Sequence, residues 1–316
     1  MGRPAPACTR IPGSRHGVCA PPSRGWTIRP AGAVYHAASR TGREDRRGSG
    51  LLLRFAFTPE QMGKRLVSVW VWISGITIGF LWVPWLGLVW LCTAPWDPGR
   101  YVVGRWFRRA AVLVTKLNPL WKFRVTGVRI PDPRRPYVAV ANHESFADIF
   151  LISHLPWEMK WLSKESIFKI PFMGWMMRMA GDIAVQRGET TSRARALAEC
   201  RDRLSKGVSV MIMPEGTRSP TGELQKFHDG AFRLAVETGC PILPIVVAGT
   251  RGALSKGSWV MNRARAVARV LPPVEVTGLT LDDVPALREK VRAMIGEARA
   301  TLLRELESGA PLPARA

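Results

Sequence analysis

The stretch that decides the fold is Asn142-His-Glu-Ser-Phe-Ala-Asp148, together with the apolar runs on either side of it. Residues 137–141 are typical of a buried strand, and residues 146–154 are typical of a helix. Five residues separate His143 from Asp148, which puts them on different faces of a continuous helix or strand. Their side chains meet only if the chain turns between them. Such a turn would bring a general base and its orienting carboxylate together at the rim of an α/β sheet.

The same residues also have a purely structural interpretation. Ser145 and Asp148 have the spacing of a helix capping box, in which two side chains accept hydrogen bonds from the backbone at a helix start. The stretch by itself is therefore compatible with two interpretations, a catalytic dyad and a helix cap.

The chain beyond Asn118 alternates short apolar runs with segments of helical period. Predicted strands cover residues 137–141, 160–163, 182–186, 208–213, 242–248 and 266–271, and predicted helices cover residues 146–154, 172–180, 192–205, 231–238 and 284–306. This alternation predicts one α/β catalytic domain over residues 118–308, with a mixed, largely parallel sheet flanked by helices. Residues 309–316 are expected to form a disordered tail.

Two further stretches place polar groups at predicted strand ends, where α/β sheets bind their ligands. In residues 214–219, Gly216 would let backbone N–H groups approach an anion, and Thr217 offers a hydroxyl. Arg218 can hold a phosphate with two parallel hydrogen bonds. Arg187 follows another short strand and is a second candidate phosphate ligand. The simpler alternatives are a polar turn at residues 214–219 and a solvated surface arginine at 187.

The composition narrows the classes of function. The 316 residues carry a formal net charge of +22, which indicates phosphate-bearing partners such as nucleic acid, anionic lipid or phosphorylated substrates. The five cysteines form no Cys-x-x-Cys pair and no cluster with histidine at metal spacing, so neither a metal site nor a disulfide framework is predicted. No glycine-rich nucleotide loop and no Gly-x-Ser-x-Gly motif is present, which argues against dinucleotide, NTPase and serine-hydrolase chemistry.

Residues 1–61 differ in composition from the remainder. They hold ten Arg and no Lys, are rich in Pro and Gly, and show no sustained period, so we expect a disordered extension. A basic arm for nucleic acid or anionic membrane is an alternative. A further hypothesis is that translation begins at Met62, where the composition changes abruptly.

Residues 66–96 form a run of 31 residues without a charge, longer than the roughly 20 needed to cross a bilayer once. Basic residues flank both ends, which favours both ends on the cytoplasmic side. Pro84 and Gly87 predict a break, so within residues 62–117 we expect a membrane-embedded helical hairpin followed by a basic amphipathic helix at 101–117. A single crossing and a cleaved signal peptide are the alternatives.

Four motifs occur in a fixed order: Asn142-His-x4-Asp148, Gly181-x5-Arg187, Glu215-Gly-Thr-Arg-Ser219 and Pro241-x-x-Pro-Ile-Val246. In this respect residues 118–280 resemble the glycerophospholipid acyltransferase family, and most closely the bacterial 1-acyl-sn-glycerol-3-phosphate acyltransferases. Residues 164–174 are similar to the family's Lys-containing stretch between the first two motifs. His228 departs from the pattern, because family members commonly carry Lys at that place.

The resemblance implies a reaction. A fatty acyl group would move from an acyl thioester, acyl-CoA or acyl-ACP, to the sn-2 hydroxyl of 1-acyl-sn-glycerol-3-phosphate (lysophosphatidic acid), giving phosphatidic acid. His143 would take the hydroxyl proton, and Asp148 would hold the imidazole and stabilise the imidazolium. Backbone N–H groups near residues 142–145 are candidates for stabilising the oxyanion. The thioester is a co-substrate, and no other cofactor is expected.

The remaining predicted site residues bind the acceptor. Arg187 and Arg218 would hold its phosphate, with Lys164 as a less certain partner. Gly216 and Thr217, in the same loop as Arg218, would also contact the acceptor. Glu215 would orient an arginine or a hydroxyl.

The predicted location is a bacterial inner membrane, with anionic lipid as a partner and the catalytic domain on the cytoplasmic face. Alternatives are another lysolipid or glycerol-3-phosphate as acceptor and, more distantly, a basic membrane-attached binding protein without catalysis. No nucleic-acid-binding motif is recognisable.

Overall fold

The computed structural model describes residues 58–130, 132–255, 257–309 and 311–312. The predicted extension therefore lies almost entirely outside the described residues, and so does most of the predicted tail. The elements are α1 (Pro59–Thr93), α2 (Tyr101–Lys116), β1 (Trp121–Gly127), β2 (Val138–Ala141), α3 (Ala147–Ile152), β3 (Met159–Lys164), η1 (Glu165–Lys169), α4 (Met173–Ala180), β4 (Ile183–Val185), α5 (Thr190–Ser205), β5 (Ser209–Ile212), α6 (Gly230–Thr238), β6 (Ile242–Ala248), β7 (Ala264–Val270), η2 (Leu281–Asp283) and α7 (Val284–Glu307).

The sheet has the strand order β1-β7-β6-β2-β5-β3-β4. Every neighbouring pair is parallel except β6 with β7, so the prediction of a mixed, largely parallel sheet is confirmed. Because β2 to β6 all point the same way, their carboxyl ends share one edge. The sequence prediction missed the edge strand β1, since Lys122 and Arg124 interrupt its apolar residues and only one of its faces is well buried.

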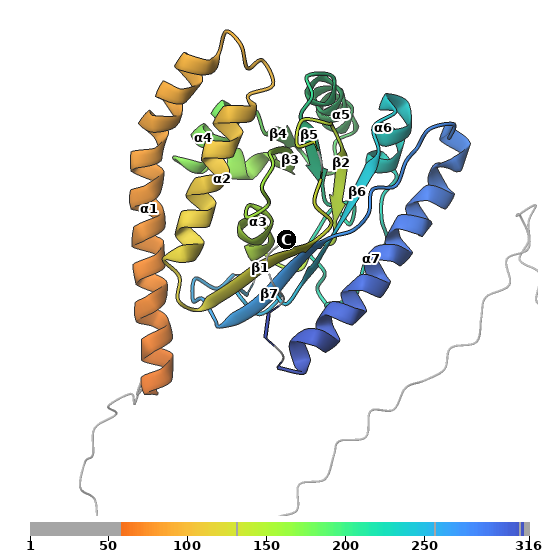
Figure 1. Ribbon diagram of the computed structural model, residues 1–316. Coiled ribbons are helices and arrows are strands. Elements are labelled where there is room, and N and C mark those ends of the chain that lie inside the picture. The colour runs from red at the N-terminus through yellow and green to blue at the C-terminus, as the bar shows by residue number, and fades with distance from the viewer. Residues whose placement is uncertain (1–57, 131, 256, 310, 313–316) are drawn as a thin grey trace, which may run out of the picture. The chain divides into compact units, whose positions relative to one another are not determined.

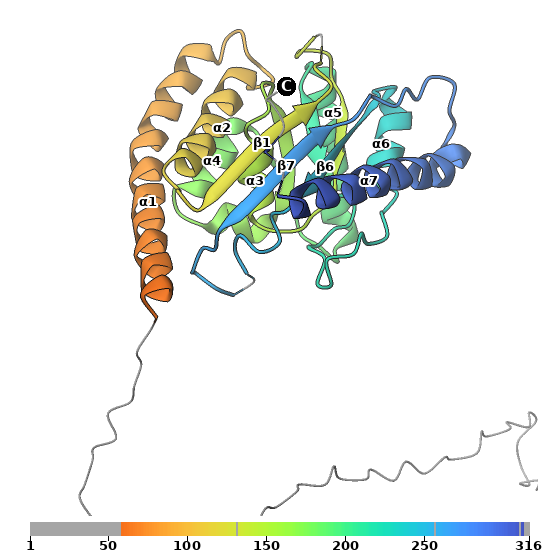
Figure 2. The same cartoon turned by 60° about the horizontal axis from the view of Figure 1, so that its bottom comes forward.

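Helices cover both faces of the sheet (Figures 1 and 2). On strand β2, Ala139 and Ala141 pack in the cluster that contains α3, while Val138 and Val140 pack with α5, α6 and α7. All four side chains are fully buried, which explains why the sequence shows a continuous apolar run rather than an alternating one.

The predicted break at Pro84 and Gly87 is wrong. Helix α1 runs unbroken through both residues for 35 residues, and it begins at Pro59, inside the segment assigned to the extension. The chain turns only at residues 94–100, where the Asp97 carboxylate accepts hydrogen bonds from the first backbone N–H groups of α2. Helix α2 then packs back along α1 (Figure 1), so the hairpin consists of α1 and the basic amphipathic helix itself.

A buried group of four charged residues fixes α2 to the sheet. Arg108 of α2 lies 2.5 Å from Asp182 and 3.5 Å from Glu158, and Lys160 lies 3.1 Å from Glu158. Burial raises the pKa of Glu158 and lowers that of Lys160, and the opposite charges beside them counteract both shifts. Gly104 faces this group, and a Cβ at that position would overlap the Glu158 carboxylate.

We expect Gly104→Ala to lower the free energy of unfolding by roughly 1–3 kcal/mol, because the added methyl group has no room beside a buried ion pair. This loss outweighs the ~1 kcal/mol by which alanine is favoured over glycine inside a helix. Thermal unfolding measures the change. Gly75→Ala on α1, where a Cβ meets nothing within 4 Å, is the matched control and should not lower the melting temperature. An equal effect of both substitutions would contradict the packing argument.

Candidate active site

The turn between β2 and α3 brings His143 and Asp148 together. Strand β2 ends at Ala141 and α3 begins at Ala147, so the histidine leaves the strand end and the aspartate lies in the first helical turn. His143 Nδ1 lies 2.7 Å from Asp148 Oδ2. Because Nδ1 faces a carboxylate, it carries the proton, and Nε2 is left with its lone pair. The imidazole is 13% exposed and is therefore within reach of a substrate.

Asp148 also closes the helix start, so both interpretations of the motif apply. Its Oδ2 accepts hydrogen bonds from the backbone N–H groups of Glu144 at 2.8 Å and Ser145 at 3.0 Å. The Ser145 hydroxyl accepts from the N–H of Ala147 at 3.3 Å. A fully buried carboxylate held by several donors has one fixed orientation, so the cap positions the imidazole as well.

Two residues that the motifs did not indicate complete this network. The hydroxyl of Thr250, fully buried just after β6, donates a short hydrogen bond to Asp148 Oδ1. Thr250 also lies 3.4 Å from Glu144 Oε2, and Arg299 of α7 donates to Glu144 Oε1 at 2.9 Å. Burial raises the pKa of Glu144, and the Arg299 charge opposes that shift. More than 100 residues separate Thr250 and Arg299 from the dyad, so no local pattern in the sequence could reveal either one.

The structure gives Glu215 backbone partners, and the prediction that it orients an arginine or a hydroxyl stays a prediction. Its carboxylate is buried, and it accepts from the backbone N–H of His143 at 2.8 Å and from that of Gln225 at 3.1 Å. The N–H of Ser219 in turn donates to the carbonyl of His143 at 3.1 Å. Glu215 is therefore a link that holds residues 214–219 against the dyad, and each of its oxygens accepts one backbone hydrogen bond.

The candidate oxyanion donors are also engaged elsewhere. The N–H groups of His143, Glu144 and Ser145 all donate to carboxylates, so they are not available to a substrate oxygen. The N–H of Gly216 donates to the Met213 carbonyl. Gly216 has φ of +70°, a conformation that favours glycine, and this is the reason for a glycine at that position. The N–H groups of Gly216 and Ser219 in this turn serve the fold, and the Thr217 side chain is exposed.

The two predicted phosphate ligands lie close to each other. Partial burial of the guanidinium and, secondarily, the charge of Arg218 lower the pKa of Arg187, although Arg187 as a residue is exposed. Among the described residues neither arginine has an ion-pair partner. Lys164, exposed at the end of β3, pairs in the sheet register with Val185, two residues before Arg187. Three positive charges thus gather at one edge of the sheet, and an anion there would relieve their repulsion.

The site places a histidine and an aspartate at the carboxyl edge of a parallel sheet, where α/β proteins bind their ligands, and the comparisons give the family. A family model described as Acyltransferase matches residues 122–248. The chain is 33% identical over 213 residues to 1-acyl-sn-glycerol-3-phosphate acyltransferase alpha of Mus musculus, covering 66% of this chain and 73% of that protein. The chain belongs to the acyltransferase family that includes this enzyme.

Other relatives carry the same name. The chain is 40% identical over 160 residues to the chloroplastic 1-acyl-sn-glycerol-3-phosphate acyltransferase LPAT1 of Arabidopsis thaliana, covering 50% of this chain and 45% of that one. The match spans only about half the length of the plant and algal relatives. The crystal structure of the 1-acyl-sn-glycerophosphate acyltransferase PlsC from Thermotoga maritima has the same fold, with a TM-score of 0.61 at 24% identity, covering 79% of this chain and all of that one.

Proposed function

We propose that the protein transfers a fatty acyl group from an acyl thioester to the sn-2 hydroxyl of 1-acyl-sn-glycerol-3-phosphate. The observation that carries this proposal is the His143 imidazole, which is held at Nδ1 by Asp148 and is partly exposed, so that Nε2 is left to act as a base. The names of the relatives supply the acceptor, and the thioester carrier is CoA or acyl carrier protein.

The reaction needs a base because a hydroxyl is a poor nucleophile at neutral pH. Nε2 of His143 accepts the proton as the hydroxyl oxygen attacks the thioester carbonyl. The buried Asp148 carboxylate stabilises the imidazolium that forms. When the carbon–sulfur bond breaks, the thiolate leaves and the imidazolium returns the proton to it. The acyl group therefore goes directly from sulfur to oxygen, without a covalent enzyme intermediate.

We further propose that the protein is attached to a membrane through α1. It is the one helix in the described part of the chain that is long and apolar enough to cross a bilayer. However, α1 contacts the domain along its length: Ser68 accepts from the N–H of Met261, Gly79 lies against Phe172, and Trp82 donates to the carbonyl of Trp106. Such a helix is not free to cross a bilayer alone, which favours insertion into one leaflet.

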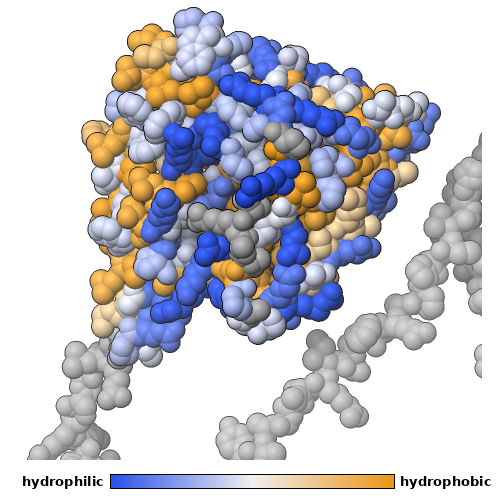
Figure 3. Space-filling view, in the orientation of Figure 1, coloured by the Kyte–Doolittle hydropathy of each residue, from blue (hydrophilic) through white to orange (hydrophobic). Residues whose placement is uncertain are grey.

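The outer side of α1 supports this arrangement. Large apolar side chains there are exposed, and Figure 3 shows apolar residues gathered along the edge that α1 forms. They include Leu66, Ile73, Ile76, Phe80, Leu81, Leu88 and Leu91. An exposed apolar face of this extent is stable in a bilayer rather than in water. A bacterial inner membrane with the domain on the cytoplasmic side stays part of the proposal.

The proposal is tested with the purified full-length chain in lipid vesicles. Acyl-CoA and acyl-ACP are each supplied with 1-acyl-sn-glycerol-3-phosphate, glycerol-3-phosphate or another lysophospholipid, and the lipid products are separated. We expect phosphatidic acid to form fastest with the first acceptor. No transfer to any acceptor would contradict an acyltransferase function, and preference for another acceptor would contradict the proposed substrate.

Substituting Arg187 and Arg218 one at a time tests the proposed contact with the acceptor phosphate. We expect Arg218→Ala, and equally Arg187→Ala, to lower kcat/KM for the phosphorylated acceptor about 10–100-fold, the effect of losing a hydrogen bond to a charged group. Use of monoacylglycerol, which has no phosphate, should be unchanged. Arg195→Ala, an exposed arginine on α5, is the matched control. A loss of the same size with both acceptors would show that the arginine supports the fold and not the phosphate.

A further inference from the structure

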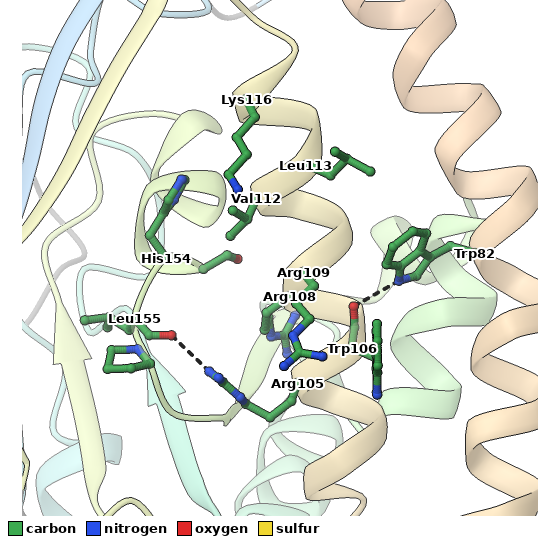
Figure 4. A pocket seen from close by; sticks show the side chains of 12 residues that line it. Trp82, Arg105, Trp106, Arg108, Arg109, Val112, Leu113, Lys116, His154 and Leu155 are labelled. Atoms are coloured by element: carbon green, nitrogen blue, oxygen red, sulfur yellow. Dashed lines mark hydrogen bonds between the residues drawn. The ribbon is translucent and has the colours of Figure 1, made fainter.

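A cavity of about 440 Å³ lies between α2, the segment 153–156 that follows α3, and Trp82 of α1 (Figure 4). None of the predicted catalytic or phosphate-binding residues lines it. Among the described residues that do, none is a carboxylate. The cavity is therefore separate from the dyad, and its polar character comes from positive charge.

Three of the cations that line the cavity belong to one stripe of α2. Arg105, Arg109 and Lys116 are spaced by four and seven residues, so they share one face of the helix. Arg105 donates to the Leu155 carbonyl at 3.2 Å, and the Arg109 guanidinium lies 4.3 Å from the centre of the Trp106 ring. No ion pair joins these three cations to a described carboxylate, and α2 contains no acidic residue.

The adjacent Arg108 shows the contrast. It also comes from α2 and also lines the cavity, but it is buried and paired with Asp182 and Glu158. Arg108, which fixes α2 to the sheet, therefore has its counter-charges within the protein. Arg105, Arg109 and Lys116 have no such partner among the described carboxylates, and Arg105 and Arg109 are held in place by a carbonyl and an aromatic ring. A preformed group of cations without internal partners is suited to an external anion.

The surroundings of the cavity indicate which anion it is. The indole N–H of Trp82 donates to the Trp106 carbonyl at 2.9 Å, and Trp85 packs edge-on against Trp106 at 5.2 Å. These tryptophans join the cavity to the exposed apolar face of α1, where Phe80 and Leu81 lie. Tryptophan and basic side chains prefer the level of lipid headgroups, between the apolar core of a bilayer and water.

We propose that this cavity binds the phosphate headgroup of an anionic phospholipid of the host membrane, as a site distinct from that of the substrate. The inference rests on the proposed attachment of α1 to a membrane. The cavity accommodates one headgroup and is too small for a folded protein or a nucleic acid. The lipid's acyl chains would continue along the exposed apolar face of α1, whose Trp82 lines the cavity.

The test measures binding of the full-length chain to vesicles of phosphatidylcholine, with and without phosphatidylglycerol. We expect tighter binding to the anionic vesicles. The triple variant R105Q/R109Q/K116Q should lose that preference, with a fall on the order of 10²-fold for three basic residues at a lipid surface. The matched control R193Q/R195Q/K290Q removes the same charge from exposed positions on α5 and α7 and should keep most of the preference.

A second variant separates a built site from diffuse charge. Val112 lines the cavity between Arg109 and Lys116, and Val112→Phe fills part of the space while keeping every cation. We expect it to lose most of the anionic preference at an unchanged melting temperature. Full retention of the preference by this variant would overturn the proposal.

Three further outcomes of the vesicle experiment show which part of the proposal is wrong. Equal binding of the wild-type chain to both vesicles would overturn the headgroup site while leaving membrane attachment intact, whereas binding to neither would contradict the attachment itself. Displacement from anionic vesicles by soluble glycerol-3-phosphate would overturn the lipid assignment in favour of a free phosphate ester.

Discussion

His143→Ala is expected to lower the rate of acyl transfer on the order of 10²–10⁴-fold, the range for loss of a positioned general base. The loss should appear in kcat, because Nε2 acts on the proton that leaves as the new bond forms. Binding to vesicles should be unchanged, since α1 and its exposed apolar face do not depend on the imidazole. Single-turnover acyl transfer and vesicle binding, measured on the same preparation, check both expectations.

The substitution also removes a hydrogen bond from a buried carboxylate, so folding must be measured alongside activity. Loss of one of the hydrogen bonds to this carboxylate costs roughly 1.5–3 kcal/mol of stability, which alone would not reduce the turnover of molecules that stay folded. His143→Gln, which keeps a polar side chain but no base, is the companion variant and should be as inactive as the alanine. Near-normal turnover by either folded variant would refute the assignment of the base.

The second large effect is expected for Asp148→Asn, on the order of 10²-fold or more in kcat. The backbone N–H groups of Glu144 and Ser145 point at Oδ2, so the amide oxygen must take that place and the amide NH₂ must face Thr250. The imidazole then keeps its tautomer and its position. What is lost is the negative charge that stabilises the imidazolium as it forms.

Ser145→Ala is the matched control, because it separates the helix cap from the dyad. It removes the hydroxyl that accepts from Ala147 N–H but leaves the contact between His143 and Asp148 intact. We expect a loss of about 0.5–2 kcal/mol in stability and an activity within a few-fold of wild type. If Asp148→Asn behaves in the same way, with lower stability and normal turnover, the motif is a helix cap alone.

Much of the fold was predictable because the central strands are buried on both faces. Residues 137–141 and 242–248 form uninterrupted apolar runs, which only a sheet covered by helices on both sides explains. The prediction failed where the environment is mixed. Strand β1 at the sheet edge carries charges on its exposed face, and Pro84 lies inside a helix whose packing on the domain holds it continuous.

Part of the candidate site could likewise be predicted from the sequence, and part could not. The sequence indicated that His143 and Asp148 would meet if the chain turned between them, and the structure has that turn. The sequence also placed Arg187 and Arg218 beyond strands that end at one edge of the sheet. The hydrogen-bond partners of Glu215 and of the backbone N–H groups could not be predicted from the sequence. Both depend on which donor each carboxylate meets, and those donors come from other segments of the chain.

The sequence by itself determined that a histidine and an aspartate lie on either side of a predicted passage from strand to helix, where a local turn would let them meet. Only the tertiary structure decided what holds the dyad and what surrounds it. Thr250, Arg299 and the cation stripe of α2 acquire their roles from elements that pack together across more than 40 residues of chain. Contacts of that kind are set by how whole helices and strands bury their apolar faces, and short-range sequence patterns carry no record of them.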